Sequence, residues 1–341
     1  MQIAFFETNP EEQKTLEDLL KPLGNVQMSF FPEPIKPTNL EQIQTTDALC
    51  VFIHSKVDKT ILDGLPNLKL IATRSTGFDH IDVACAKTKN ISVCNVPSYG
   101  SRTVAEFTFS LILGLARKTF LAYRQVKNNH DFDISHFQGF DLQGKTLGVV
   151  GTGKIGQNVI KIAKAFEMKV LAFDLFENSE LAKTLEFEYK NLDAVLRQSD
   201  VLTLHVPYNK ETHHLINLQN IKLIKPGAIL VNTARGEVVE TDALVWAIQE
   251  KILSGVGLDV LEGEKELCEE CVLVATQPGK NPACAIDFKL LLEDHMLINQ
   301  PETAITPHIA FFSKEAKHEI LQTTSENISN FLNGKPKNFV G

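Results

Sequence analysis

The chain has 341 residues, of which 43% are hydrophobic and 22% are charged, and its formal net charge at pH 7 is −8. This length is about twice that of a common domain, so we expect two globular domains. The acidic balance argues against a nucleic-acid or anionic-membrane surface, which would need clustered lysines and arginines, and leaves small molecules as the expected partners.

The amino-terminal stretch "MQIAFFETNPEEQ" has no basic residues before its apolar run and then becomes acidic. This is typical of a first strand rather than of a secretion signal, so we expect a cytoplasmic protein. Asn9, Pro10 and Glu12 then form the N-cap, first position and capping box of a helix. Four further runs, "VQMSFF", "ALCVFI", "LKLIATR" and "ISVCNVP", alternate with helical stretches, a pattern that predicts a doubly wound parallel α/β sheet.

After "VPSYGSR" the apolar periodicity predicts one long helix that ends near Lys127. Its apolar part, "VAEFTFSLILGLA", contains Glu106 and falls short of the roughly 20 residues needed to span a bilayer, so we expect a buried helix. A second sheet follows, with strands at "TLGVV", "KVLAFD", "DVLTLHVP", "GAILVNTA" and "GVGLDV".

The first strand of the second sheet runs directly into a glycine-rich turn and a helix. Such a turn lets backbone N–H groups and the positive end of the helix approach a pyrophosphate. The next strand ends in Asp174, which is placed to accept hydrogen bonds from ribose hydroxyls, and residues 175–178 contain no Arg or Lys for the extra phosphate of NADP. The sequence therefore predicts NAD as the cofactor. The residues of the turn predicted to bind it are Gly151, Gly153, Lys154, Ile155 and Gly156.

Three charged or titratable residues follow later apolar strands: Arg235, Glu264 and His308. Taken singly, each is as readily a surface ion pair, a solvated charge or a satisfied polar side chain. Together they match the chemistry of 2-keto acid reduction by NADH. A guanidinium binds a carboxylate with two hydrogen bonds, an imidazole delivers a proton, and a carboxylate stabilises and orients the imidazolium.

Four motifs in this order, "VVGTGKIGQ", "VNTARGEVVETDAL", "GVGLDVLEGE" and "ITPHIAFFSKEA", resemble signatures of the NAD-dependent D-2-hydroxyacid dehydrogenases, and the likeness extends over essentially the whole chain. The resemblance implies that Arg235 binds the carboxylate and carbonyl of the substrate. It implies that His308 is the general acid and base, and that Glu264 pairs with His308. It also implies further cofactor contacts from Val206, Pro207, Thr212, Thr233, Ala234 and Asp259, the last at the nicotinamide end.

The same resemblance implies a flavodoxin-like substrate domain formed by residues 1–100 and completed by residues 310–341, with a Rossmann NAD-binding domain at residues 101–309 and the substrate cleft between them. Backbone N–H groups around Thr76 and Gly77 are expected to bind the substrate carboxylate. The apolar helix near residues 104–116 resembles the segment through which the family dimerises, so we expect a homodimer or a larger homo-oligomer.

Within the family, "PHIAFFSKEA", the opening "IAFFETNPEEQ" and Tyr99 in "VPSYGS" are similar to the D-lactate dehydrogenase branch. Aromatic side chains there would close a small pocket around a methyl group, with Tyr99 among the substrate-binding residues. Core packing is the alternative role for each of these aromatics: Phe5, Phe6, Tyr99, Phe311 and Phe312.

Reduction of pyruvate to D-lactate is therefore the expected reaction. Two alternatives stay open: the same chemistry on hydroxypyruvate, glyoxylate or a branched or longer keto acid, and a non-enzymatic NAD sensor of the same fold. The chain between Glu264 and His308 is longer than D-lactate dehydrogenases of this branch usually show, which bears on the substrate and not on the three proposed catalytic residues.

The cysteines predict no disulfide framework. Cys268 and Cys271 form a CxxC motif, with Cys284 and His295 further along, and zinc sites use cysteine pairs of this spacing. Because the pair lies in an acidic stretch without a second tight pair, we expect no metal.

Overall fold

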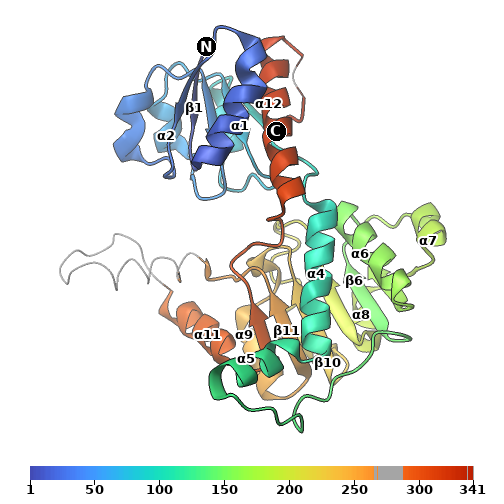
Figure 1. The fold of residues 1–341 in the computed structure, drawn as a ribbon. Coiled ribbons are helices and arrows are strands. Elements are labelled where there is room, and N and C mark those ends of the chain that lie inside the picture. The colour runs from blue at the N-terminus through green and yellow to red at the C-terminus, as the bar shows by residue number, and fades with distance from the viewer. Residues whose placement is uncertain (265–266, 268–286, 336, 341) are drawn as a thin grey trace. The chain divides into compact units, whose positions relative to one another are not determined.

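The structure, a computed structural model, describes residues 1–264, 267, 287–335 and 337–340. It divides the chain into one unit formed by residues 1–99 and 312–341 and a second formed by residues 100–311. Each unit is a parallel sheet covered by helices, drawn in Figure 1. The predicted pair of doubly wound α/β domains is confirmed.

The first unit contains a five-stranded sheet in the order β2-β1-β3-β4-β5, and every neighbouring pair is parallel. This is the strand order of flavodoxin-like folds. Its strands are β1 (Gln2–Phe5), β2 (Gln27–Phe30), β3 (Ala48–Val51), β4 (Leu70–Thr73) and β5 (Ser92–Cys94). All five lie where the sequence predicts them.

Helices cover both faces of this sheet. One face packs against α1 (Pro10–Leu20) and the carboxyl-terminal helix α12 (Lys314–Leu332), which lie side by side in Figure 1. The other face packs against the helices η2 (Pro37–Ile43), α2 (Lys59–Asp63) and α3 (Val83–Thr88). The predicted capping box is present, since the Glu12 N–H donates to Asn9 Oδ1 at 3.0 Å and the Glu12 carboxylate accepts from the Asn9 N–H.

Two of the aromatic residues considered for the substrate pocket belong to this core. Phe5 and Phe6 are completely buried and, being adjacent at the end of β1, lie on opposite faces of the sheet. Phe5 stacks on Phe30 and Phe6 stacks on Phe31, with ring centroids 4.9 and 4.6 Å apart. For these two residues, core packing is the role that the structure shows.

The second unit contains a seven-stranded parallel sheet in the order β12-β11-β10-β9-β6-β7-β8. Counted from its own first strand, this is the Rossmann order with one more strand at the end. The strands are β6 (Thr146–Val150), β7 (Lys169–Phe173), β8 (Glu188–Tyr189), β9 (Val201–Leu204), β10 (Ala228–Asn232), β11 (Leu253–Leu258) and β12 (Thr303–Ile305).

The two faces of this sheet pack against different helices. On one face lie α4 (Ser101–Ala116), α6 (Lys154–Ala165) and α7 (Ser179–Leu185). On the other lie α8 (Leu192–Gln198), η3 (Ile221–Leu223), α9 (Thr241–Gln249) and α11 (Phe288–Asn299). Because both faces are covered, strands such as β9 and β10 are completely buried and apolar throughout most of their length.

The prediction of a single long helix that ends near Lys127 is wrong. The structure has two helices, α4 and α5 (Thr119–Asn129), which are separated at Lys118 by a left-handed backbone with φ of 51°. The carbonyl of Ala116 accepts a hydrogen bond from the Phe140 N–H at 3.0 Å, and Gly139 lies so close to that carbonyl that a Cβ would be 2.2 Å from it. A distant loop therefore closes the end of α4.

The apolar helix α4 is buried against its own sheet, as predicted. No helix in the described part of the chain combines the length and the apolar character needed to cross a lipid bilayer.

Candidate active site

Arg235 lies directly beyond β10, at the carboxyl end of the sheet of the second unit. The side chain of Asn232, 1% exposed, shapes this turn by accepting from the Ala234 N–H at 3.0 Å and donating to the Arg235 carbonyl at 2.8 Å. Gly236 then packs against the next loop so tightly that a Cβ would lie 2.1 Å from the Leu261 carbonyl. The loops after β10 and β11 are therefore in backbone contact.

Glu264 is carried by the loop after β11, and both of its carboxylate oxygens have partners. Oε1 accepts from the Leu261 N–H at 3.0 Å, and Oε2 lies 3.2 Å from Nδ1 of His308. Glu262 in the same loop binds His214 Nε2 at 2.7 Å and the Thr241 hydroxyl at 2.9 Å. The loop is thus held in place at two points, and the predicted pairing of Glu264 with His308 is present in the geometry.

His308 lies beyond β12 in a left-handed backbone conformation with φ of 53°. Asp259, 1% exposed, holds this segment: its carboxylate accepts from the Thr306 hydroxyl at 2.6 Å and from the N–H groups of Ile309 and Ala310 at 2.9 and 2.7 Å. Its carbonyl accepts from the His308 N–H at 2.9 Å. Burial raises the pKa of Asp259 above its ordinary value although these hydrogen bonds oppose it.

The electrostatics around Glu237 show that the charges beyond β10 and β11 act on one another. Burial raises the pKa of the half-buried Glu237 carboxyl, the Glu264 and Glu262 carboxylates raise it further, and the Arg235 guanidinium lowers it. Because β10, β11 and β12 are neighbours in the sheet, Arg235, Glu264 and His308 emerge from adjacent strand ends, where parallel α/β sheets bind ligands. Arg235 therefore follows a strand at the same edge of the sheet as the His308–Glu264 pair.

The aromatic residue in ring contact with this pair is Phe311, whose ring lies at 78° to the His308 ring with a centroid distance of 6.5 Å. Phe312 is 60% exposed and belongs to the first unit. Phe311 is therefore the aromatic residue of the second unit best placed to shape an apolar wall beside His308.

The glycine-rich turn after β6 fits a dinucleotide. Gly151 has φ of 97°, and a Cβ there would lie 2.6 Å from the His205 carbonyl. At Gly156 a Cβ would lie 2.0 Å from the Gly151 carbonyl, whereas at Gly153 it would meet nothing within 4 Å. Helix α6 begins at Lys154 and Ile155 with no side-chain cap on its N–H groups. Open space in front of uncapped donors is what a pyrophosphate requires.

Asp174 closes this turn. Its Oδ2 accepts from the Thr152 N–H at 2.7 Å and the Thr152 hydroxyl at 2.9 Å, and its Oδ1 accepts from the Phe176 N–H at 3.0 Å. Partial burial alone raises the pKa of Asp174, but the hydrogen bonds outweigh it and hold the pKa below its ordinary value. The carboxylate is therefore charged, and Oδ1 keeps capacity for a ribose hydroxyl.

The other predicted cofactor residues lie in the second unit near the ends of β9 and β10. Val206 and Pro207 follow β9, with Val206 in contact range of the Gly151 turn, and the Thr212 hydroxyl donates to the Pro207 carbonyl at 2.6 Å. Thr233 and Ala234 follow β10, and the Thr233 hydroxyl lies 3.0 Å from that of Thr108 in α4.

The residues predicted to bind the substrate carboxylate by their backbone lie in the first unit, beyond β4. The Thr76 hydroxyl donates to the Val96 carbonyl at 2.8 Å, and the Ser75 hydroxyl donates to the Gly77 carbonyl at 2.6 Å. Within the described part of the chain, the N–H groups of Thr76 and Gly77 donate to no protein acceptor. Tyr99 is the last residue of the first stretch of this unit.

The residues considered for zinc lie mostly outside the described part of the chain. Cys268, Cys271 and Cys284 fall outside it, as does most of the lengthened segment before His308, whereas His295 lies on α11. Among the residues that the structure describes, no group of three or more His, Cys, Asp or Glu side chains could hold a metal ion.

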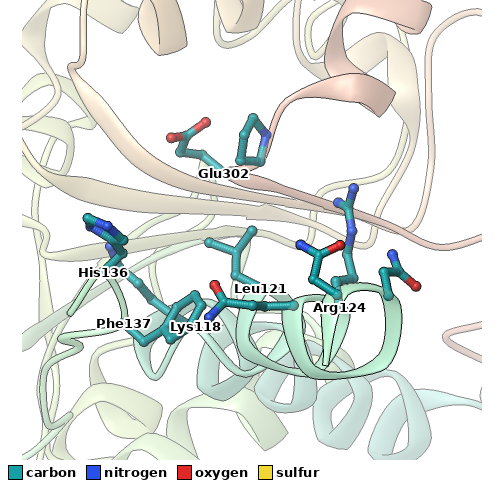
Figure 2. A pocket seen from close by; sticks show the side chains of 10 residues that line it. Lys118, Leu121, Arg124, His136, Phe137 and Glu302 are labelled. Atoms are coloured by element: carbon teal, nitrogen blue, oxygen red, sulfur yellow. The ribbon is translucent and has the colours of Figure 1, made fainter. Parts of the chain in front are cut away.

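A separate pocket of about 390 Å³ lies in the second unit between α5, the 136–137 turn and residues 301–302, as Figure 2 shows. None of the predicted site residues lines it. The lining residues include Lys118, Leu121, Arg124, His136, Phe137 and Glu302.

Sequence reasoning missed the side chains that set the positions of the candidate catalytic residues. Asn232 sits in an otherwise apolar strand, and a buried amide in such a strand was a readable signal that its side chain binds the backbone. Glu262 gave no comparable signal, because acidic residues in loops are usually solvated.

The chain is similar to known proteins in both sequence and fold. The profile described as D-isomer specific 2-hydroxyacid dehydrogenase, NAD binding domain, matches residues 109–310. Glyoxylate reductase from Thermococcus litoralis is 35% identical over 324 residues, or 92% of this chain and 90% of the reductase. D-lactate dehydrogenase from Escherichia coli is 31% identical over 338 residues, 98% of each chain. The solved structure of D-lactate dehydrogenase from Aquifex aeolicus complexed with NAD and lactic acid has a TM-score of 0.86 and 36% identity, covering 99% of this chain and 98% of that one.

Proposed function

The chain belongs to the D-isomer specific 2-hydroxyacid dehydrogenases, and on this premise we propose that it reduces pyruvate reversibly to D-lactate with NADH. It is an NAD-dependent D-2-hydroxyacid dehydrogenase whichever keto acid it prefers. The observation that carries the catalytic assignment is the contact between His308 and Glu264, beside the loop that carries Arg235.

NAD is held by the second unit. The uncapped N–H groups at the start of α6 would hold the pyrophosphate, and Asp174 would accept a hydrogen bond from the adenosine ribose. The negative charge of Asp174 repels the additional phosphate of NADP. When bound, NADH supplies the hydride that adds to the carbonyl carbon of the substrate.

Arg235 binds the substrate carboxylate and polarises the adjacent carbonyl. A guanidinium can do both at once because its N–H groups form a planar fork. Asn232 fixes the backbone on both sides of Ala234, so the fork starts from a rigid turn. In the first unit, the N–H groups of Thr76 and Gly77 supply further donors to the carboxylate.

His308 donates the proton that converts the carbonyl oxygen into a hydroxyl and removes it in the reverse reaction. Its Nδ1–H donates to Glu264, which leaves Nε2 to exchange the proton with the substrate. Glu264 stabilises the imidazolium and fixes the ring plane, and Leu261 in turn fixes Glu264.

The choice of pyruvate rests on aromatic residues near the site. The Phe311 ring lies roughly perpendicular to that of His308, and an aromatic wall suits a methyl substituent better than a polar one. Tyr99 is proposed to close the same pocket. Glyoxylate is the second candidate, because the reductase from Thermococcus litoralis is as similar to this chain as the lactate dehydrogenases are.

Membership of the dehydrogenase family, together with the paired His308 and Glu264, favours catalysis over the NAD-sensing alternative. The decisive assay follows NADH oxidation with pyruvate, hydroxypyruvate, glyoxylate, oxaloacetate and branched keto acids, and repeats each with NADPH. The highest kcat/KM with pyruvate and NADH would support the proposal, whereas a higher value with glyoxylate would replace pyruvate by the second candidate.

A cytoplasmic homodimer is part of the same proposal. The second unit exposes apolar side chains on α5 and in the turn after it, among them Phe120, Tyr123 and Ile134, and this surface adjoins α4. Sedimentation equilibrium at micromolar concentration tests the assembly, and a mass of one chain would contradict it.

A further inference from the structure

The carboxyl-terminal residues of the chain return to the edge of the first sheet. Phe339 forms an antiparallel bridge with Cys94 at the end of β5, and the Val340 N–H donates to the Val93 carbonyl at 3.0 Å. These residues follow α12, the long helix that packs against α1 in Figure 1. The carboxyl-terminal residues therefore pair with β5, the strand that leads to Asn95.

Asn95 is held on both sides of its backbone by this carboxyl-terminal segment. Its N–H donates to the Asn338 carbonyl at 3.1 Å, and its carbonyl accepts from Asn327 Nδ2 of α12 at 2.8 Å. Asn338 Nδ2 donates to Asn327 Oδ1 at 2.8 Å, which closes the ring of contacts. Asn95 is 7% exposed and Asn327 is 2% exposed, so water does not compete for these groups.

The side chain of Asn95 reaches from this ring to the loop after β4. Its Nδ2 donates to the Thr76 carbonyl at 2.7 Å. Beside it, the Val96 N–H donates to the Ser75 carbonyl at 3.0 Å and the Val96 carbonyl accepts from the Thr76 hydroxyl. The backbone of residues 75–77 is thus held by residues 95 and 96 through contacts that do not use the Thr76 and Gly77 N–H groups.

We propose that Asn95, Asn327 and Asn338 are positioning residues that orient the Thr76–Gly77 backbone for the carboxylate of the substrate. This rests on the proposed function, because it takes the N–H groups of that loop as the carboxylate donors. Asn95 acts on the loop directly, and Asn327 and Asn338 act through Asn95. The end of the chain, far from this loop in sequence, thereby contributes to substrate affinity.

The side chain of Asn338 offers the cleanest test, because it can be removed without changing its backbone. Asn338 has φ of 55°, a left-handed conformation that glycine adopts without strain. Asn338→Gly keeps the carbonyl that accepts from Asn95 and removes only the amide that binds Asn327. The matched control is Lys337→Ala, a change at the exposed neighbouring residue.

Steady-state kinetics with pyruvate and NADH should show a KM for pyruvate raised about three- to tenfold in Asn338→Gly, the range expected for one hydrogen bond in a buried network. The kcat and the Kd for NADH should stay within about twofold, because neither Arg235 nor the cofactor turn is touched. Lys337→Ala should match the wild type. An unchanged KM in Asn338→Gly, or an equal loss in kcat, would overturn the proposal.

A second variant, Asn95→Ala, removes the direct contact with Thr76. It tests whether the effect of Asn338 on the loop depends on the Asn95 side chain. If Asn338 acts through Asn95, the double variant should have a KM close to that of Asn95→Ala alone. KM increases that multiply in the double variant would mean two independent effects and would contradict this dependence.

Hydrogen exchange separates this proposal from the function on which it rests. The Val96 N–H, bound to Ser75, should exchange several-fold faster in Asn338→Gly than in Lys337→Ala, and this readout needs no substrate. If the wild type turned over no 2-keto acid, the proposed function would fail. Hydrogen exchange would still show whether Asn338 stabilises the contacts between residues 95–96 and the Thr76–Gly77 loop. An equal exchange rate of the Val96 N–H in all variants would mean that Asn338 does not stabilise this loop.

Discussion

Nδ1 of His308 lies 3.2 Å from Oε2 of Glu264, and the other oxygen of that carboxylate is fixed by the Leu261 N–H. Asp259 also holds the backbone around His308. Its carbonyl accepts from the His308 N–H, and its carboxylate accepts from the N–H groups of Ile309 and Ala310. Both the ring and the main chain of the proposed proton donor are therefore set by the end of β11.

Replacing His308 with Gln should lower kcat by on the order of a hundredfold to ten-thousandfold, since an amide cannot deliver the proton. The Kd for NADH, measured by fluorescence titration, should be unchanged because the cofactor residues are untouched. His318→Gln, at an exposed position of α12, is the control. Turnover within a few-fold of the wild type would remove His308 from the mechanism.

Replacing Arg235 with Lys should reduce kcat/KM for the keto acid roughly ten- to hundredfold, because an ammonium group cannot reproduce the paired hydrogen bonds of the guanidinium. Steady-state kinetics with pyruvate and a parallel titration with NADH separate the two binding events. The role assigned to Arg235 is wrong if the variant keeps normal kinetics, or if NADH affinity alone is lost.

Replacing Asp174 with Ala should shift the ratio of kcat/KM for NADH over NADPH by roughly tenfold or more toward NADPH, because the repulsion of the additional phosphate is removed. Glu177→Ala, an exposed acidic residue of the same loop, is the matched control and should leave the ratio unchanged. An identical ratio in the Asp174 variant and the wild type would mean that cofactor choice is set elsewhere.

The cofactor preference of the wild type should also be independent of pH between about 7 and 9. Hydrogen bonds from Thr152 and Phe176 overcome the effect of partial burial and keep the pKa of Asp174 low, so its charge does not change in this range. Kinetics with both cofactors at several pH values check this. A preference that changed steeply across the interval would point to another titrating group.

Glu293 should make the stability of the second unit fall with rising pH. Lys289 of α11 pairs with Asp242 of α9, and its Nζ lies 3.3 Å from Glu293 Oε1. Burial and the hydrogen bond with Asp242 raise the pKa of Glu293 from 4.5 to about 7. Between these values the folded chain keeps a proton that the unfolded chain has lost, so stability decreases as pH rises through the interval.

Glu293→Gln removes this titration and keeps a donor toward Asp242. The Tm of the variant should therefore increase relative to the wild type between about pH 5.5 and pH 8, measured by calorimetry. Glu250→Gln, at an exposed position after α9, should show a constant difference from the wild type. A constant difference for Glu293→Gln as well would contradict the raised pKa.

Much of the fold could be predicted because local patterns determine it. Apolar runs located β1 to β5 and most of the second sheet, and Asn9, Pro10 and Glu12 marked the start of α1. The break between α4 and α5 could not be predicted, because the Ala116 carbonyl is taken by Phe140 through tertiary contact. The two-residue strand β8 was missed because it is too short to show a period.

The candidate site, like the fold, could be predicted only in part from the sequence. Motif positions identified Arg235, Glu264 and His308, and the contact between the last two is present. The part played by Asp259 in holding the His308 segment was not foreseen, because a carboxylate at a strand end gives no sign of which distant N–H groups it binds. Contacts that join residues some fifty positions apart depend on strand order, which spacing alone does not reveal.

Arg235, Glu264 and His308 all belong to the unit that carries the cofactor turn, while Thr76, Gly77 and Tyr99 belong to the other. On the proposed roles, the groups for hydride and proton transfer lie in one unit and further substrate contacts lie in the other, so the second set can change without the first, as relatives named for different acids would require. A chimera that imports specificity from one of them must exchange both segments of that unit, because without α12 the face of the first sheet that α1 and α12 cover together would lose part of its packing.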